Sequence, residues 1–567
     1  MTRFWRGEAR RERRAPPPYC TSLNKSGAIP NILQLNEDSF RLTGDSLKTN
    51  KKTFSRTARY WLLSVALAAG LSAQTHAAPV SEWAHVGADG KLIYKTLPAG
   101  DRIMDFSSAG YRGGGVKIPS VPVAQTISPS GGDDSDTIQA AINQVSAMEL
   151  HVGFRGAVLL AQGVFNCSQT LAIKAGGVVL RGSGSGADGT TIKMTGAPHL
   201  CFSIGSGGEA KPIGKPAAIT DAYVPSGTFS FHVSNADSFK AGDTVLINRP
   251  ATPAWVKFMG MDTLVRNGKP EHWVSGEMHT ERVIKSIAEN LLTLDVPLAD
   301  SFDAKYLNPP GGSVVKCDLS GRLTQIGVEN LRIVSPPQAL TINQPHNKAL
   351  RMDGVSDAWV RDLKVENSMN SFWFGEHTSR VTVDHVDIRH EAASIGSAKP
   401  MDFWAGGTQT LINRCSATGD NVFYFSTGSR MMGPVVVLNG IFHGNGHIQP
   451  HMRWATGLLV DNCQVPESGI DLMNRGEMGS GHGWTTGWSV AWNCTAKSFV
   501  IQQPPGSANW AIGCNGAQET APMPFLKGPM LPQGIVDSNN TPVAPASLYL
   551  AQLRERLGAQ ALANIGY

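Results

Sequence analysis

Histidines and arginines gather in two neighbouring stretches of the sequence, GIFHGNGHIQPHMRW (residues 440–454) and DLMNRGEMGSGHGW (residues 471–484). The four that could carry chemistry are His451, Arg453, Arg475 and His482. Removal of the C5 proton of a uronate sugar needs a cation that neutralises the neighbouring carboxylate and a base that accepts the proton. Arginine supplies the cation, and histidine can act as acid or base near neutral pH. The stretches therefore predict β-elimination on an acidic glycan, although a turn residue bound to backbone is the alternative for any single histidine.

Metal binding is a weaker interpretation of the same region. His443, His447 and His451 are spaced as they would be on one face of a helix, but the intervening glycines and Pro450 argue against a helix. We therefore predict no metal ligands. Calcium stays possible as a cofactor, because it too can neutralise a uronate carboxylate.

Two aspartates offer a different chemistry. Asp402 lies in KPMDFWAGG (residues 399–407) and Asp420 in SATGDNVFYF (residues 416–425). An inverting glycoside hydrolase uses one carboxyl group as acid and another as base, with a water held between them. Asp402 and Asp420 could supply that pair, but an Asx-type turn beside Gly419 is the structural alternative for Asp420.

Aromatic residues spread along the same region favour a saccharide ligand, because flat rings bury the C–H faces of sugars well. About half of these rings are expected to pack in turns instead. The residues predicted to contact substrate are Lys399, Trp404, Tyr424, Trp454 and Trp484.

A ragged repeat must position these side chains. Related short segments begin at residues 330, 362, 385, 414, 439, 462 and 493, so successive starts differ by 23 to 32 residues. Such a period indicates stacked units that share one core. Asn462-Cys463 and Asn493-Cys494 recur at the same phase, which predicts inward stacking of polar groups or sulfur. Cys494 and Cys514 could also pair in a disulfide, and buried free cysteines are the alternative.

The opening of the repeat region carries a family resemblance. GGDDSDTIQAAINQV (residues 131–145) has apolar residues at helical spacing and precedes short glycine-punctuated β runs. This order resembles the pectate-lyase-like superfamily of right-handed parallel β-helix carbohydrate-active enzymes. The resemblance implies an all-β, right-handed parallel β-helix with short capping helices. It implies less about chemistry, because the superfamily includes lyases, hydrolases and non-catalytic members.

A second, partial resemblance bears on the hypothesis that the protein is a hydrolase. The stretches around Asp402 and Asp420 are similar to the NTDG and GDD motifs of polygalacturonase-type hydrolases, and Gly481-His482-Gly483 matches their GHG motif. However, Asn421 stands where the third carboxylate would be. The GHG motif also lies 62 residues after Asp420, further than the family's usual separation of about one coil.

The spacing of the repeated segments is interrupted over residues 225–316. Alternating strands and hairpin-like turns there predict a β-rich module inserted in the β-helix. The predicted organisation is a leader (1–77, of which 1–46 could be untranslated), an N-terminal extension (78–130), the helical cap with the first coils (131–224), the inserted module (225–316), coils that carry the active groove (317–520), and a C-terminal tail (521–567). The tail contains an amphipathic helix that could cover the open end of the coils.

Residues 51–77 have the basic start, the apolar run of 11 residues and the small-residue end of a signal peptide. The run is too short to span a bilayer, so we predict a secreted or periplasmic protein without a stable membrane anchor. The remaining residues contain 37 Lys+Arg and 40 Asp+Glu, which argues against a nucleic-acid partner.

Three readings of function follow from these patterns. The favoured hypothesis is a lyase that cleaves a uronate-containing polysaccharide. A hydrolase that uses Asp402 and Asp420 is the second hypothesis, and a non-catalytic glycan-binding or surface protein is the third. The sequence leaves the oligomeric state open. Residues 474–488 are expected to form a functional edge, and a glycine-rich turn with a buried histidine is the alternative. A functional edge places His482 within about 10 Å of Asp402, Asp420, Arg453 or His451, because neighbouring coils stack at strand spacing.

Overall fold

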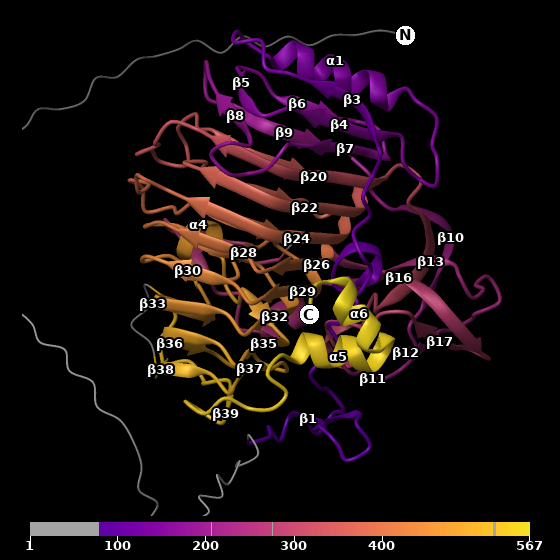
Figure 1. The fold of residues 1–567 in the computed structure, drawn as a ribbon. Coiled ribbons are helices and arrows are strands. Elements are labelled where there is room, and N and C mark those ends of the chain that lie inside the picture. The colour runs from indigo at the N-terminus through magenta and orange to yellow at the C-terminus, as the bar shows by residue number, and fades with distance from the viewer. Residues whose placement is uncertain (1–78, 206, 275, 525–528) are drawn as a thin grey trace, which may run out of the picture. The chain divides into compact units, whose positions relative to one another are not determined.

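A computed structural model describes residues 79–567 apart from 206, 275 and 525–528. The predicted signal peptide lies outside the described residues. The chain forms a right-handed parallel β-helix, in which each strand pairs in parallel with a strand one coil later. For example, Val360 of β22 (Val355–Glu366) pairs with Val383 of β24 (Thr378–Arg389). Helix α1 (Ser135–Ser146) lies at the top of the stack in Figure 1 and packs apolar residues such as Ile138 and Ile142 onto the first coils.

Three parallel sheets form the walls of the coils. In the early coils the first two sheets share long strands, namely β20 (Leu323–Val334), β22 and β24. In later coils the first sheet contains β26 (Thr408–Asn413), β29 (Met432–Leu438), β32 (Ala455–Asp461), β35 (Ser489–Trp492) and β37 (Asn509–Ile512). The second contains β27 (Ser416–Thr418), β30 (Ile441–His443), and the first parts of β33 (Gln464–Leu472) and β36 (Thr495–Ile501). The third contains β21 (Lys348–Met352), β23 (Phe372–Phe374), β25 (Met401–Ala405), β28 (Phe423–Thr427) and β31 (His447–Ile448).

A column of bent residues separates the first sheet from the second. Its members have left-handed backbone conformation, with φ between 49° and 58°: Asn330, Asp362, His385, Arg414, Asn439, Asn462 and Asn493. These are the residues at which the repeated segments of the sequence begin. Asparagine and aspartate adopt this conformation more readily than other residues with a Cβ atom, which explains the recurrent Asn at this phase.

The core is a set of apolar ladders inside the coils. One ladder joins seven consecutive coils through paired residues: Val360, Val383, Ile412, Val437, Val460, Ala491 and Ala511. All are buried in one cluster with the interior phenylalanines. Because the coils share this ladder, each is stabilised mainly by its two neighbours.

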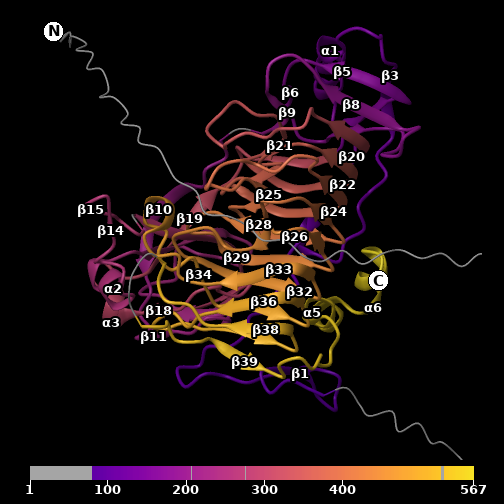
Figure 2. The same ribbon diagram turned by 90° about the vertical axis from the view of Figure 1, so that its left-hand side faces the viewer.

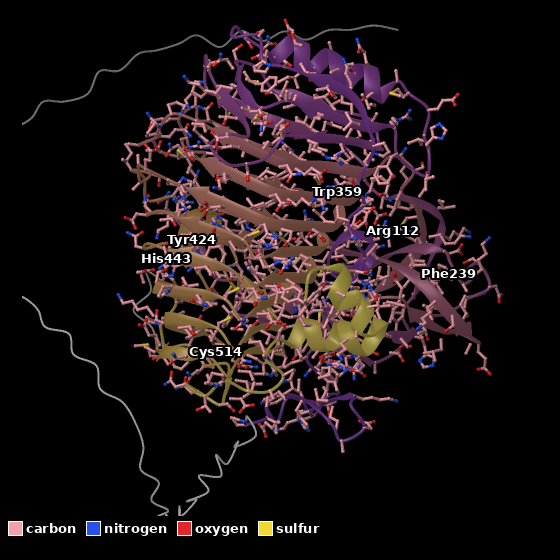
Figure 3. The ribbon with its side chains drawn as sticks, in the orientation of Figure 1. Arg112, Phe239, Trp359, Tyr424, His443 and Cys514 are labelled. Atoms are coloured by element: carbon pink, nitrogen blue, oxygen red, sulfur yellow. The ribbon has the colours of Figure 1, made fainter. Side chains whose placement is uncertain are left out.

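Cysteines form a second interior ladder immediately after the bend column. Cys463, Cys494 and Cys514 occupy equivalent positions in successive coils, which confirms the predicted inward stacking. Of the two alternatives for Cys494 and Cys514, the structure has buried free thiols rather than a disulfide (Figure 3 labels Cys514). Each thiol instead donates to a carbonyl of an earlier coil, Cys494 to Val460 and Cys514 to Ala491.

The inserted module is an antiparallel sheet, ordered β10-β19-β13-β16-β17-β12, that lies beside the coils (Figure 1). Its strands are β10 (Lys211–Ala218), β12 (Ser230–His232), β13 (Thr244–Pro250), β16 (Glu277–Ala288), β17 (Leu291–Leu294) and β19 (Ser313–Asp318). The module starts before the predicted residue 225, because β10 pairs with β19 rather than with a coil. It also carries α2 (Pro253–Phe258), α3 (Ala304–Leu307), and the short pairs β11 (Tyr223–Val224) with β18 (Phe302–Asp303) and β14 (Val265–Arg266) with β15 (Lys269–Pro270).

The C-terminal helices α5 (Leu548–Leu557) and α6 (Ala559–Asn564) cover the outer face of the first sheet. Leu548 and Leu553 of α5 belong to the same buried cluster as Val490 and Trp510, which corrects the expectation that this helix covers the open end. No helix among the described residues is long and apolar enough to cross a membrane.

Candidate functional site

An aromatic row lies on the outer face of the third sheet. Arg351, Trp373 and Trp404 occupy paired positions in β21, β23 and β25, and we call these three residues the aromatic row. The Trp373 and Trp404 rings are nearly parallel, at 7°, with centroids 4.7 Å apart. The Arg351 guanidinium lies 4.2 Å from the centre of the Trp373 ring. Both tryptophans keep part of their surface exposed, but the Trp373 ring is stacked between Arg351 and Trp404, so the row presents mainly ring edges and the Arg351 guanidinium to solvent.

The four predicted histidines and arginines come together a few coils further along. His451 and Arg453 follow β31, whereas Arg475 and His482 lie in the loop formed by residues 473–485, after β33. The His451 and His482 ring centroids are 4.6 Å apart, which confirms the expected proximity of His482 to His451. Arg475 Nη1 lies 3.1 Å from His451 Nδ1 and donates to the His451 carbonyl at 2.9 Å.

Phe423 forms one wall of this group. The Lys399 ammonium lies 5.7 Å and the Arg475 guanidinium 5.2 Å from the centre of its ring, and the His451 ring meets it edge to face at 5.9 Å. We call Lys399, His451, Arg453, Arg475 and His482 the basic cluster. Phe423 was not predicted as a site residue, although strand alternation alone implies that only one of Phe423 and Tyr424 can face outward.

Electrostatics keep the histidines of the basic cluster neutral. Burial, with repulsion from Arg475 and Arg453, lowers the pKa of His451 to about 3. Burial, with repulsion from His451 and the same arginines, lowers the pKa of His482 to about 2. Burial also lowers the pKa of Arg475 to about 10, against the opposing charge of Asp471. Arg475 Nε and His482 Nδ1 are buried without a hydrogen-bond partner among the described residues. The cluster is therefore suited to an anion that has hydrogen-bond acceptors.

The loop of residues 473–485 is held from two sides. Arg475 N donates to Gly483 O at 2.8 Å, and Gly483 N donates to Gly476 O at 2.9 Å, which closes the base of the loop. From the inserted module, the Trp273 indole N–H lies 3.1 Å from both the His482 and the Trp484 carbonyl oxygens. Gly479 (φ 59°) leaves room for the His482 ring, since a Cβ atom there would lie 2.0 Å from His482 Nε2.

Three of the predicted substrate-binding aromatics are buried instead. Trp454 and Trp484 pack in the core of the inserted module, where their indole N–H groups donate to Asp300 and to the Met259 carbonyl. Tyr424 stacks on Phe442 inside the coils, and its hydroxyl contacts Gly419 O and Gly446 N. None presents a ring face to solvent, so the expected sugar contacts are not available to these three residues.

The two predicted catalytic aspartates occupy unlike places. Asp402 is fully buried, where it accepts hydrogen bonds from His390 Nε2 at 2.7 Å and Ser371 Oγ at 3.2 Å. Although burial opposes it, the Asp402 carboxylate raises the pKa of His390. Asp420 is exposed and accepts from Asn445 N of the next coil at 2.9 Å, which is a contact between coils rather than the local Asx-type turn given as its alternative. An acid and a base that share one water need a common opening, which this arrangement does not provide.

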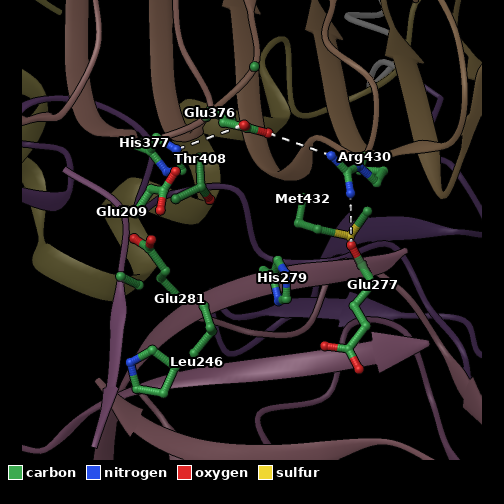
Figure 4. A pocket seen from close by; sticks show the side chains of 14 residues that line it. Glu209, Leu246, Glu277, His279, Glu281, Glu376, His377, Thr408, Arg430 and Met432 are labelled. Atoms are coloured by element: carbon green, nitrogen blue, oxygen red, sulfur yellow. Dashed lines mark hydrogen bonds and ion pairs between the residues drawn. The ribbon is translucent and has the colours of Figure 1, made fainter. Parts of the chain in front are cut away.

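An acidic cavity of about 380 Å³ lies between β16 of the inserted module and the turns of the coils (Figure 4). Its charged lining comprises Glu209, Glu277, His279, Glu281, Glu376, His377 and Arg430. Arg430 donates to Glu277 O and lies 4.0 Å from Glu376. Sequence patterns did not indicate this cavity, because the two halves belong to segments far apart in the chain.

The cavity, the aromatic row and the basic cluster are neighbours. Gly406, which lines the cavity, lies directly under the Trp404 ring, and Arg430 N donates to Arg453 O at 3.0 Å. In Figure 2 the third-sheet strands β21, β25 and β28 lie beside β10 and β19 of the module. Within the described part of the chain, no group of three or more His, Cys, Asp and Glu residues is placed to hold a metal ion.

No protein-family model matches the sequence, and no curated protein matches it. Solved structures with a similar fold include the tailspike protein gp49 from Pseudomonas phage LKA1, which is 12% identical over 72% of this chain and 72% of its own (TM-score 0.33). The mannuronan C-5 epimerase AlgE4 A-module of Azotobacter vinelandii is 10% identical over 70% of this chain and 88% of its own (TM-score 0.28). The surface protein and adhesin PfbA of Streptococcus pneumoniae is 10% identical over 73% and 87% (TM-score 0.32). At these values the likeness transfers no function to this chain.

Proposed function

We propose that the protein binds an acidic, uronate-containing polysaccharide along the aromatic row and cleaves it by β-elimination at the basic cluster. The observation that carries this proposal is the contact of Arg475 with His451 and of His451 with His482. It joins a cation to two neutral imidazoles, and these are the groups that the elimination needs. The aromatic row supplies partly exposed ring edges and the Arg351 guanidinium for contacts with neighbouring sugars.

The proposed role of each residue in the elimination follows from its protonation state. Arg475, with Arg453 and Lys399 nearby, neutralises the uronate carboxylate and so makes the C5 proton more acidic. Because arginine can only donate hydrogen bonds, the Nδ1 atom of a neutral His451 accepts from Arg475 and its ring proton lies on Nε2. His451 is thus the donor toward the leaving-group oxygen, and His482 is the base that takes the C5 proton.

Base strength at His482 depends on the substrate. In the free protein, burial and the positive charges of Arg475 and Arg453 hold its pKa near 2. A bound carboxylate offsets those charges and raises the pKa of the ring. The cluster would therefore gain a competent base only when an anionic sugar is in place.

The test is incubation of the intact protein with polygalacturonate, alginate, hyaluronan and neutral glycans, with and without a calcium chelator. A lyase forms an unsaturated product that absorbs in the ultraviolet. We expect Arg475→Lys and His482→Gln to lower kcat by about 10²- to 10⁴-fold while the protein stays folded. Asp420→Asn, which keeps the acceptor for Asn445 N, is the matched control and should leave kcat nearly unchanged.

Two other outcomes would replace this proposal. Reducing ends without ultraviolet absorbance, abolished by Asp420→Asn, would identify a hydrolase. Binding without any product, weakened by Trp404→Ala, would identify a glycan-binding protein that uses the aromatic row alone. The partly exposed, stacked Trp373 and Trp404 support this last candidate, whereas the burial of Asp402 disfavours the hydrolase.

Export belongs to the same proposal, since a large polysaccharide is met outside the cell. It rests on the predicted signal peptide. N-terminal sequencing of the mature protein should find a start near Ala78, and recovery of longer chains from the cytoplasm would contradict it.

A further inference from the structure

A second cavity, of about 370 Å³, lies between the N-terminal segment, the inserted module and the turns of the last coils. Asp101 comes from the first of these parts, Arg249 and Tyr306 from the second, and Trp488 and Ser507 from the third. The cavity shares no lining residue with the basic cluster or with the acidic cavity. It is therefore a separate place at which a small ligand could bind.

Arg249 is the main polar group of this cavity. Its side chain is buried, and only Nε donates within the described residues, to Ser301 O at 2.8 Å, with Asp300 Oδ2 at 3.3 Å. Nη1 is buried without a hydrogen-bond partner in the part of the chain that the structure describes. Because a guanidinium carries five N–H donors, its terminal nitrogens keep donors for a ligand.

Asp300 cannot take up those donors. Its carboxylate already accepts from Trp454 Nε1 at 2.7 Å, Trp488 Nε1 at 3.0 Å and Ser301 N at 2.8 Å. Ser507 Oγ, in the turns of the last coils, is also buried without a partner among the described residues. Buried polar groups without partners are rare because they cost free energy, and two that line one cavity indicate an occupant.

Aromatic rings form the other walls. Phe258 and Tyr306 are half-buried and stack on each other with centroids 4.0 Å apart. The Arg249 guanidinium lies 4.5 Å from the Trp255 ring, which fixes the orientation of its fork. Flat apolar faces beside planar polar groups suit a ligand that has C–H faces and hydroxyl edges, as a pyranose has.

The charges around Arg249 decide between a neutral and an acidic ligand. Asp300 offsets the positive charge of Arg249, and Asp101 adds a further carboxylate, which accepts from Tyr223 Oη and Ser226 N. A ligand carboxylate would approach three carboxylates, those of Asp101, Asp300 and Asp303, and one guanidinium. We infer that this cavity binds a neutral sugar unit, whose hydroxyl oxygens accept from Arg249 and whose ring face packs on the aromatic wall of Phe258 and Tyr306. The volume is at the small end of ligand pockets, so the site takes one or two rings.

The test is titration of the intact protein with glucose, galactose, mannose, N-acetylglucosamine and cellobiose, and with galacturonate and glucuronate as charged counterparts. Binding is measured by calorimetry and by tryptophan fluorescence, because Trp255, Trp454 and Trp488 line the cavity. At least one neutral sugar should bind more tightly than either uronate. Arg249→Lys keeps the charge but loses the planar fork, and should weaken binding by about tenfold or more.

Tyr306→Ala and Ser507→Ala carry the same test if Arg249→Lys does not fold, as judged by circular dichroism, and both should weaken binding. His451→Gln is the control that should leave this affinity unchanged. Cleavage of an acidic glycan by Arg249→Lys should match that of the wild type, so the inference stands or fails independently of the proposed function. Absence of binding by every neutral sugar, tighter binding of a uronate, or wild-type affinity in all three cavity variants would overturn it.

Discussion

His451 and His482 illustrate how surroundings set the charge of a residue. An isolated histidine changes charge near neutral pH, but burial and two nearby arginines favour the neutral form of both rings. Each ring is then unprotonated over a wide pH range, but it is a weak base as long as no bound anion offsets the charges of the arginines. The same effect makes the stability of the protein depend on pH in a calculable direction.

We expect the free energy of unfolding to fall as the pH is lowered from about 6.5 toward 3. In that window the two histidines bind protons in the unfolded chain but not in the folded protein, whose pKa values are about 3 for His451 and about 2 for His482. Stability therefore increases with pH, by at most about 1.4 kcal/mol per pH unit for each histidine. Urea unfolding at several pH values should show a shallower dependence for the double variant His451→Gln/His482→Gln. The exposed His151→Gln serves as the matched control for the substitution, and an unchanged slope in the double variant would contradict the neutral histidines.

At the scale of elements, the loop of residues 473–485 shows how one segment of the module fixes a loop of the coils. The loop closes on itself through Arg475, Gly476 and Gly483, and Trp273 then clamps it through the two carbonyl oxygens that flank Gly483. His482 and Arg475 therefore keep their orientation because a residue some 200 positions earlier in the chain holds the loop.

Trp273→Phe should keep most of the ring but lose both hydrogen bonds. We expect a loss of about 1–3 kcal/mol in the free energy of unfolding and a fall in kcat on the acidic glycan, because the His482 base would be less well positioned. Trp255→Phe is the matched control, since Trp255 stacks on Trp273 at 5.0 Å within the same core but does not clamp the loop. Chemical denaturation and steady-state kinetics compare the two variants. Equal effects on kcat would show that general packing, rather than the clamp, positions the loop.

At the scale of the whole molecule, the inserted module acts as one wall of the site. It covers Met432, Trp454 and Trp484 on the coils and brings Trp273 to the loop of residues 473–485. Its ends are close together, because Ile204 and Leu323 pair with Met352 and Val355 of one neighbouring coil. The module can therefore be removed without interrupting the coils.

Replacement of residues 211–318 by a short Gly-Ser linker should leave the parallel coils folded, because their ladders lie outside the module. Exposure of Met432, Trp454 and Trp484 should each lower the free energy of unfolding by about 1.5–3 kcal/mol. The exposed side chains should also bind a hydrophobic dye. Glycan cleavage should be lost. Circular dichroism, dye fluorescence and the cleavage assay measure the three effects, and a truncated protein with full activity would show that the module does not position the site.

The sequence by itself determined the coil period, the register of the bend column and the residues of the basic cluster. The repeated segments begin at bend residues such as Asn439, Asn462 and Asn493, so local conformational preference and stacking agree there. His451, Arg453, Arg475 and His482 lie on adjacent coils, and strand spacing then brings neighbours together.

Only the tertiary structure decided which side chains face the solvent and which are covered. Phe423 lies at the site, whereas Tyr424 and Phe425 both lie in the core, where the pairing of β28 with β31 is irregular. A change of phase by one residue moves a side chain to the opposite face of a strand. Asp402 is buried with His390, and Trp454 and Trp484 lie under the inserted module. The acidic cavity and the second cavity, beside Arg249, are likewise formed by segments that are distant in the chain. Composition and periodicity predict which residues are neighbours along one coil. Whether a side chain on the coils is covered by the inserted module depends on contacts between distant segments, which no local pattern encodes.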